Sequence, residues 1–321
     1  MSAPPHQISS ASHHLSPVAN PLVVIVGPTA VGKTEISIQL AEQLNGEIVS
    51  ADSRLFYRGM DIGTAKPTLA ERARVPHHLI DVADPDEAWN LAVFQQAAHQ
   101  AIAGIHRRGR LPFLVGGTGQ YVRAVTFGWM PPAKGPDVRL RLVFEKLVGI
   151  EGREWLHARL KLLDSPAAEK IDPRNVRRTI RALEVILTTG KRFSEQCGFS
   201  ETPYRLLTIG LTRTRPELYA RIDARVETMF ASGLLVEART LLANGYSPAL
   251  PSMSAIGYRH CIAVLQGEIS LAQAVIEIKR ATRVFVRRQA NWFKADDPSI
   301  HWFDARSTPI SELASCIKTA L

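Results

Sequence analysis

Eight residues near the amino terminus, GPTAVGKT from Gly27 to Thr34, have the spacing of a phosphate-binding loop. They stand between an apolar run, Leu22–Val26, and a helical pattern, which is the context this motif requires. Its glycines let the backbone turn N–H groups toward an anion, Lys33 adds a point charge, and the Thr34 hydroxyl can take part in holding Mg²⁺. We therefore expect a diphosphate or triphosphate site. Its predicted residues are Gly27, Pro28, Thr29, Ala30, Val31, Gly32, Lys33 and Thr34.

The loop alone does not define the reaction. A nucleotide hydrolase also needs a carboxylate at the end of a nearby strand, which holds Mg²⁺ and positions water. The best such strand, Phe113–Val115, runs instead into the glycines of Gly116–Gly119, and Asp81 is a weak substitute. These residues favour a kinase or another transferase over a motor or a switch GTPase.

The segment SADSRLFYRGMDIGTAKP, Ser50–Pro67, follows the second strand pattern. Loops after parallel strands share one sheet edge, so we expect Asp52 to lie beside the phosphate loop. Asp52 is interpreted first as a general base toward a hydroxyl or an amine; a water-mediated Mg²⁺ ligand and a simple turn cap are the alternatives. Asp61 is expected to be structural, in a turn. Lys66 either faces the anion or is a solvated surface lysine.

Two stretches in the second half, Asp172–Arg192 and Ile276–Lys294, are rich in lysine and arginine and poor in carboxylates. Helical spacing places Arg177 and Arg181 on one face of the first stretch. One-sided charge of this kind favours contact with a polynucleotide backbone over a solvated helix face. Two further basic residues, Arg221 and Arg225, either reach an anion together or flank carboxylates on an exposed helix.

Strand and helix patterns alternate up to about residue 130, which predicts a parallel sheet covered by helices on both faces. Only helical spacing follows, with breaks near residues 164–166 and 171–175, before strands return at 205–211 and 299–303. Long helices are expected over 215–242 and 271–294. The prediction is therefore an α/β fold, a P-loop NTPase-like parallel sheet core with a helical insertion domain. The core spans residues 20–133 and 201–321, the insertion 134–200, and a disordered leader 1–19.

Composition narrows the class further. The 321 residues carry a formal charge of +9 and have 45% hydrophobic content, which suits a folded protein with a polyanionic partner. The three cysteines are far apart and include no CxxC pair, so neither a zinc ribbon nor a disulfide framework is indicated. No apolar run approaches the length of a membrane span. We expect a cytoplasmic monomer that does not enter membranes.

Together the motifs resemble one family, the tRNA dimethylallyltransferases, or adenosine-37 isopentenyl transferases, in their bacterial form. The resemblance implies transfer of a dimethylallyl group from dimethylallyl diphosphate to N6 of adenine 37 in the tRNA anticodon loop, giving N6-isopentenyladenosine and diphosphate. The phosphate loop would then hold the prenyl donor instead of ATP. The motifs, in family order, are GPTAVGKT, SADSRLFYRGMDIGTAKP, PHHLIDVADPDE, VGGTGQYVRAV, RALEVILTTGK, SAIGYR and TRVFVRRQANWF.

The resemblance also implies roles for single residues. Asp52 is similar to the general base, Lys33 and Thr34 to the catalytic residues of the loop with Thr34 on the Mg²⁺ side, and Arg225, with Arg221, to the diphosphate contacts. Mg²⁺ is the implied cofactor, and tRNA and dimethylallyl diphosphate are the implied partners. The implied tRNA contacts are Asp52, Ser53, Arg54, Leu55, Thr118, Arg139, Arg177, Arg178, Thr179, Ile180, Arg181, Ser254, Ala255, Ile256, Gly257, Tyr258 and Arg259.

This chain departs from the family pattern at three places. Leu55 stands where glutamine is frequent, Asp172 where histidine is common, and Asn291 where threonine is frequent. No Cys/His zinc module follows the core.

Two rival hypotheses about function remain open from the residues alone. One is a small-molecule or nucleoside kinase that uses the loop for ATP, and the other is a non-catalytic RNA-binding protein.

Overall fold

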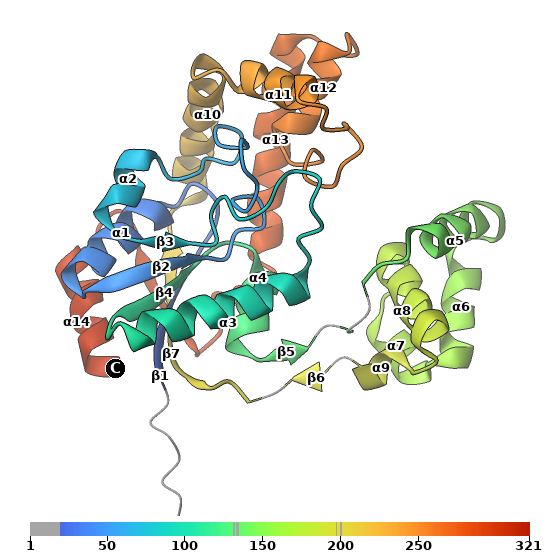
Figure 1. Cartoon of the computed structure of the whole chain (residues 1–321), viewed down its shortest axis with the longest axis horizontal. Coiled ribbons are helices and arrows are strands. Elements are labelled where there is room, and N and C mark those ends of the chain that lie inside the picture. Colours follow the sequence, from blue (N-terminus) through green and yellow to red (C-terminus); the bar gives the residue numbers. More distant parts are fainter. Residues whose placement is uncertain (1–19, 131, 133–134, 197, 200) are drawn as a thin grey trace, which may run out of the picture.

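A six-stranded parallel sheet lies at the centre of the protein (Figure 1). The structure is a computed structural model that describes residues 20–130, 132, 135–196, 198–199 and 201–321, so the predicted leader 1–19 lies outside the described residues. The strand order is β3-β2-β4-β1-β7-β8, and the α/β prediction is confirmed. The strands are β1 (Asn20–Val26), β2 (Gly46–Ser50), β3 (His77–His78), β4 (Leu111–Val115), β7 (Tyr204–Thr212) and β8 (Ile300–Asp304).

Strand β1 is buried on both faces, as its apolar run predicts. The helices around the sheet are α1 (Lys33–Gln43), α2 (Leu69–Arg74), α3 (Leu91–Arg107), α4 (Gly119–Thr126), α10 (Arg215–Ala231), α11 (Leu234–Ala243), α12 (Tyr258–Leu265), α13 (Leu271–Gln289) and α14 (Ile310–Ala320). Alternate side chains of β1 enter two different cores. Val23 and Ile25 pack with residues of α1, α10 and α14, whereas Val24 packs with residues of α3 and α4.

One predicted helix is wrong in extent. The pattern over 215–242 is divided into α10 and α11, because Gly233 adopts a left-handed φ of 99° and turns the chain between them. α11 and α12 pack with the loop around Met60 in a third core, above one end of the sheet in Figure 1. No helix among the residues that the structure describes is long and apolar enough to cross a membrane.

A group of helices lies apart from the sheet, at the right of Figure 1. It has a core of its own that includes Phe144, Leu156, Leu160 and Leu183. A short antiparallel pair, β5 (Trp129–Met130) and β6 (Gly198–Phe199), joins it to the rest of the chain. We keep the predicted domain boundary as a proposal. The helices are α5 (Val138–Glu151), α6 (Arg153–Leu163), α7 (Ser165–Lys170), α8 (Val176–Thr189) and α9 (Phe193–Gln196).

Gly46→Ala should destabilise the sheet. At Gly46 a Cβ would lie 2.4 Å from the Phe113 ring and 2.8 Å from the Leu111 carbonyl oxygen, so β2 and β4 would have to separate. We expect a loss of about 1–3 kcal/mol in the free energy of unfolding, measured by urea denaturation. Gly104→Ala is the control, since the nearest atom there is the flexible end of Arg108 at 3.4 Å; it should stabilise α3 by up to about 1 kcal/mol. Equal midpoints would contradict this account.

Candidate active site

The phosphate loop connects β1 with α1 at the carboxyl edge of the sheet. Its turns need left-handed backbone at Gly27 (φ 149°), Ala30 (φ 68°) and Gly32 (φ 113°). At Gly27 a Cβ would also meet the Leu211 carbonyl oxygen of β7 at 2.6 Å, so only glycine fits there. The first N–H groups of α1 have no acceptor within the helix and are therefore available to an anion.

Cationic side chains hold the carbonyl oxygens of this loop. Lys33 Nζ donates to the oxygens of Gly27 and Pro28, at 2.9 Å each. Arg221 Nε donates to Ala30 O at 2.7 Å, and Arg213 Nε donates to Val31 O at 2.8 Å. The carbonyls are thus engaged from the protein side. The N–H groups of Thr29 and Val31 are also taken, by Gln289 Oε1 and Pro28 O, so the N–H groups at the start of α1 are the ones available to an anion.

The electrostatics of the loop also favour an anion. Burial lowers the pKa of Lys33 to about 8, an effect that Asp52 opposes and Arg225 strengthens. Burial likewise lowers the pKa of Arg225 below its usual range, with a further contribution from Arg221. Cations that are partly removed from water lack full compensation until an anion binds beside them.

The two arginines of α10 lie at the loop and its cavity, and their joint contact with an anion stays a prediction. Arg221 contacts Ala30, and Arg225 lines the neighbouring cavity. The carboxylates beside them in sequence turn to α13, where Asp223 accepts a hydrogen bond from Arg283 at 2.7 Å and Glu227 pairs with Lys279 at 2.7 Å. Arg283 and Lys279 of the second basic run are therefore paired with α10.

Asp52 follows β2 and lies in the same cavity, as predicted. Its Oδ1 accepts the backbone N–H of Arg54 at 3.0 Å, so the turn-cap interpretation holds for one oxygen. For Oδ2, no protein donor exists within the described part of the chain, and this oxygen is free for a ligand.

The cavity beside the loop has a volume of about 780 Å³ and draws its walls from distant parts of the chain. The phosphate loop supplies Thr29, and α8, in the separate helical group, supplies Arg177. Helix α13 adds Arg280, Phe285 and Arg288. Predicted site residues that line it are Thr29, Asp52, Ser53, Arg54, Thr118, Arg177, Arg225, Ser254, Ala255, Ile256, Gly257 and Arg259.

Three predicted tRNA contacts are buried. Thr179, Ile180 and Tyr258 are at most 2% exposed, and Ile180 and Tyr258 pack in the cores of the helical group and of α11–α12. Their roles toward RNA stay predictions. The other predicted contacts outside the cavity are Leu55, which is half-buried, Arg139 and Arg178, which are exposed, and Arg181, which pairs with the buried Glu184 at 3.1 Å.

The glycines of Gly116–Gly119 allow a close approach to the backbone, and the approaching groups belong to the protein. A Cβ at Gly116 would lie 2.3 Å from Ala51 O, and one at Gly117 would lie 2.3 Å from Gln289 Nε2. One at Gly119 would lie 2.3 Å from the Trp292 ring. The cluster therefore packs the loop before α4 against β2 and the end of α13.

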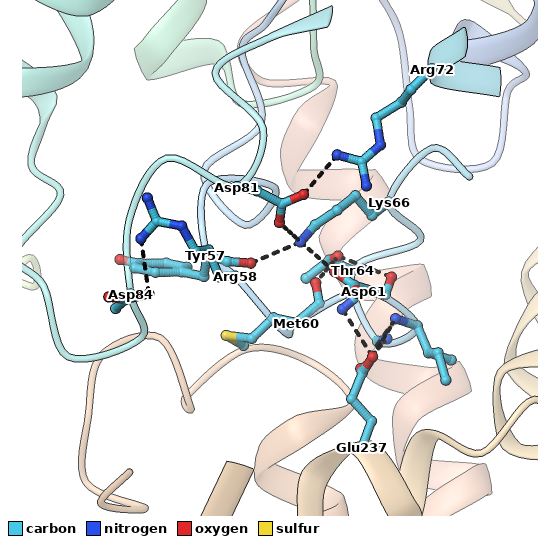
Figure 2. Close-up of polar contacts among 12 residues, drawn as sticks. Tyr57, Arg58, Met60, Asp61, Thr64, Lys66, Arg72, Asp81, Asp84 and Glu237 are labelled. Carbon is cyan, nitrogen blue, oxygen red and sulfur yellow. Dashed lines mark hydrogen bonds and ion pairs between the residues drawn. The ribbon is translucent and has the colours of Figure 1, made fainter. Parts of the chain in front are cut away.

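Both interpretations of Lys66 are wrong. Its side chain is 1% exposed and donates to Tyr57 O at 2.8 Å, to Asp61 at 2.5 Å and to Asp81 at 2.5 Å (Figure 2). Asp81 also accepts a hydrogen bond from Arg72 at 2.7 Å. Burial raises the pKa of Asp81, but the bonds from Lys66 and Arg72 outweigh it and lower this pKa overall. These residues fix a loop and do not face the anion site.

Glu237 of α11 fixes the same loop from its other side (Figure 2). Its carboxylate accepts the backbone N–H groups of Asp61, Ile62 and Gly63 at 2.9–3.2 Å and the phenol of Tyr258 at 2.5 Å. The next residues, Gly63 to Ala65, line the cavity. Sequence reasoning missed Glu237, Arg213 and Gln289, because an isolated polar residue on a helix carries no signal of its tertiary partners.

Oxygen donors near the loop are of a kind that suits Mg²⁺. The Thr34 hydroxyl and the Asp52 carboxylate are hard ligands of the kind that Mg²⁺ prefers, and Mg²⁺ commonly keeps water and phosphate oxygens as its other ligands. In the described residues, no cluster of three or more His, Cys, Asp or Glu side chains could hold a metal on its own.

The fold and the site define a P-loop α/β protein in which the anion loop opens into a large basic cavity. Within that class, the family described as IPP transferase matches residues 55–296, and isopentenyl transferase matches residues 20–80. The chain belongs to the IPP transferase family.

Known relatives extend over nearly the whole chain. A tRNA dimethylallyltransferase of Roseiflexus sp. strain RS-1 is 54% identical over 92% of this chain and 97% of its own length. The tRNA isopentenylpyrophosphate transferase of Bacillus halodurans superimposes with a TM-score of 0.70 at 44% identity, covering 94% of this chain and 96% of its own. The structure of a eukaryotic dimethylallyltransferase acting on tRNA superimposes with a TM-score of 0.76 at 29% identity. The match covers 90% of this chain and 74% of the eukaryotic chain.

The pKa of Lys33 predicts a pH dependence of anion binding. Protonated Lys33 binds the anion, so affinity should fall as the pH rises through about 8. Inorganic diphosphate binding, measured by calorimetry, should weaken about tenfold between pH 7 and pH 9 relative to Lys33→Arg, which stays charged. Dividing by the values for Lys33→Arg removes the titration of diphosphate itself. Parallel pH profiles of the two proteins would show that Lys33 does not titrate in this range.

Proposed function

We propose that this protein transfers a dimethylallyl group from dimethylallyl diphosphate to N6 of adenine 37 in the anticodon loop of tRNA. The products are N6-isopentenyladenosine and diphosphate. The observation that carries this proposal is one cavity that joins an anion loop, a free carboxylate oxygen of Asp52 and arginines from the four helices α8, α10, α12 and α13. The activity for which the relatives are named supports it, since these relatives align with nearly all of this chain.

The donor end of the reaction uses the phosphate loop. Loop N–H groups, Lys33 and Arg225 would bind the diphosphate and stabilise the charge that grows on it as the bond between C1 and oxygen breaks. The Thr34 hydroxyl, together with the diphosphate, would hold Mg²⁺, which neutralises part of the same charge when bound. Arg221 supports the loop through Ala30 O and remains within reach of the anion.

The acceptor end uses Asp52. The lone pair of the exocyclic adenine amine is delocalised into the ring, so the amine is a weak nucleophile. Removal of its proton by Asp52 Oδ2 as the bond from N6 to C1 forms would assist attack. The target base must leave the anticodon-loop stack to reach the donor, which costs a few kcal/mol that other contacts must offset. Arginine contacts to the RNA backbone can supply this energy.

A transfer assay tests the proposal. Unmodified tRNA is incubated with labelled dimethylallyl diphosphate and Mg²⁺, and we expect label on adenine 37. Asp52→Asn keeps the turn acceptor for Arg54 but cannot accept the proton, so the single-turnover rate should fall at least about 100-fold with tRNA affinity within a few fold. Absence of label with the wild-type protein would reject the proposal. Transfer of the γ-phosphate of ATP in its place would favour a kinase.

Arg177 should contribute a phosphate contact. Arg177→Ala should weaken tRNA binding several-fold and reduce the slope of log affinity against log salt by about one, measured by filter binding or anisotropy. Arg174→Ala is the matched control from the same basic run, because Arg174 is paired with Asp172 at 2.6 Å and does not line the cavity. Identical salt slopes for the two variants would make Arg177 part of a solvated helix face.

A further inference from the structure

Gln289, the last residue of α13, has an amide that is engaged at both ends. Its Oε1 accepts the backbone N–H of Thr29 at 2.8 Å, and its Nε2 donates to Gly117 O at 3.0 Å. The residue is only 5% exposed. A buried amide with a donor and an acceptor both satisfied holds its two partners at a fixed separation.

The Gln289 amide packs directly against the backbone of Gly117, with no space for a side chain between them. A Cβ on Gly117 would lie 2.3 Å from Gln289 Nε2, so the amide rests directly on the backbone. Trp292, three residues after Gln289, covers Gly119 in the same way. The end of α13 is therefore fixed on the loop that precedes α4.

Both of the loops joined by this amide border the cavity. Thr29 belongs to the phosphate loop. Gly117 directly precedes Thr118, whose Oγ1 lies 3.5 Å from the backbone nitrogen of Ser53, beside Asp52. Thr29, Asp52 and Thr118 all line the cavity. A change in the Gln289 bridge would therefore shift the anion loop relative to the loop that carries Asp52.

We propose that Gln289 is a positioning residue that sets the separation between the departing diphosphate and the Asp52 carboxylate. It also occupies the N–H group of Thr29, which then cannot donate to the anion. The inference rests on the proposed transfer reaction. Its expected signature is a loss of rate without a matching loss of affinity for either substrate, because both loops remain intact and only their spacing changes.

The first test compares Gln289→Met with Val286→Ala. Methionine has a similar length but makes neither hydrogen bond. Val286 lies in the core on the same helix and contacts neither loop through a hydrogen bond, so its variant controls for general destabilisation. With both substrates saturating, we expect the single-turnover rate of Gln289→Met to fall about 10-fold to 100-fold. Dissociation constants for tRNA and donor should stay within about threefold, and Val286→Ala should keep the wild-type rate.

Gln289→Glu is the second variant. It retains the acceptor for the Thr29 N–H but places a carboxylate oxygen against Gly117 O, where the two acceptors repel each other, so its rate should fall at least as far as that of Gln289→Met. This variant carries the test if the methionine variant does not fold. A rate equal to that of Val286→Ala, or a loss fully restored by more donor, would overturn the proposal.

Amide hydrogen exchange supplies a readout that does not need activity. Gln289→Met should accelerate exchange in peptides covering residues 27–34 and 116–121, whereas Val286→Ala should not. Unchanged exchange in both peptides would show that Gln289 does not hold the two loops together, and would overturn the proposal. If wild-type protein transfers no dimethylallyl group, the proposed function fails, and faster exchange in the methionine variant would still establish the bridge between the loops.

Discussion

The site depends on how the backbone of the phosphate loop is held. A loop that turns its N–H groups toward an anion must place its carbonyl oxygens elsewhere, and each needs a partner. Lys33, Arg213 and Arg221 provide these partners, and they come from α1 and from the region that follows β7. The same cations that stabilise the loop create the positive potential around it. The stability of the loop and its attraction for an anion thus have one electrostatic origin.

The cavity combines two kinds of basic lining. The phosphate loop contributes backbone and the buried cation Lys33, and Arg177, Arg280 and Arg288 contribute side chains from α8 and α13. Asp52 lines the same cavity. The loop of residues 60–66 is fastened by Lys66 on one side and Glu237 on the other, so this wall is pre-formed. Such rigidity favours reaction, since donor and acceptor need little rearrangement once both are bound.

The sequence predicted the parallel sheet, the phosphate loop and the place of Asp52, because each depends on a local pattern: an apolar run, spaced glycines, a carboxylate after a strand. It failed where tertiary contacts decide. Lys66 has the sequence neighbourhood of a surface lysine, and its burial follows only from the arrival of Asp81. The position of Gln289 within a basic run gives no hint of its two buried backbone partners. Periodicity over 215–242 continues across the turn at Gly233, so the break between two helices was not recognised.

The position of β7 has a consequence for how the chain is assembled. The whole length of β1 pairs with β7, from Asn20 opposite Tyr204 to Val26 opposite Gly210. In the sheet, β7 lies between β1 and β8. During synthesis, β1 therefore emerges with one edge open, and its partner appears only after α5–α9 have been made. An apolar strand with an open edge is a template for pairing with other chains. The time needed to translate the helical group is thus a period in which the open edge of β1 can pair with other chains. A chaperone that covers this edge would lower the risk of aggregation, and slow folding of β7 would prolong it.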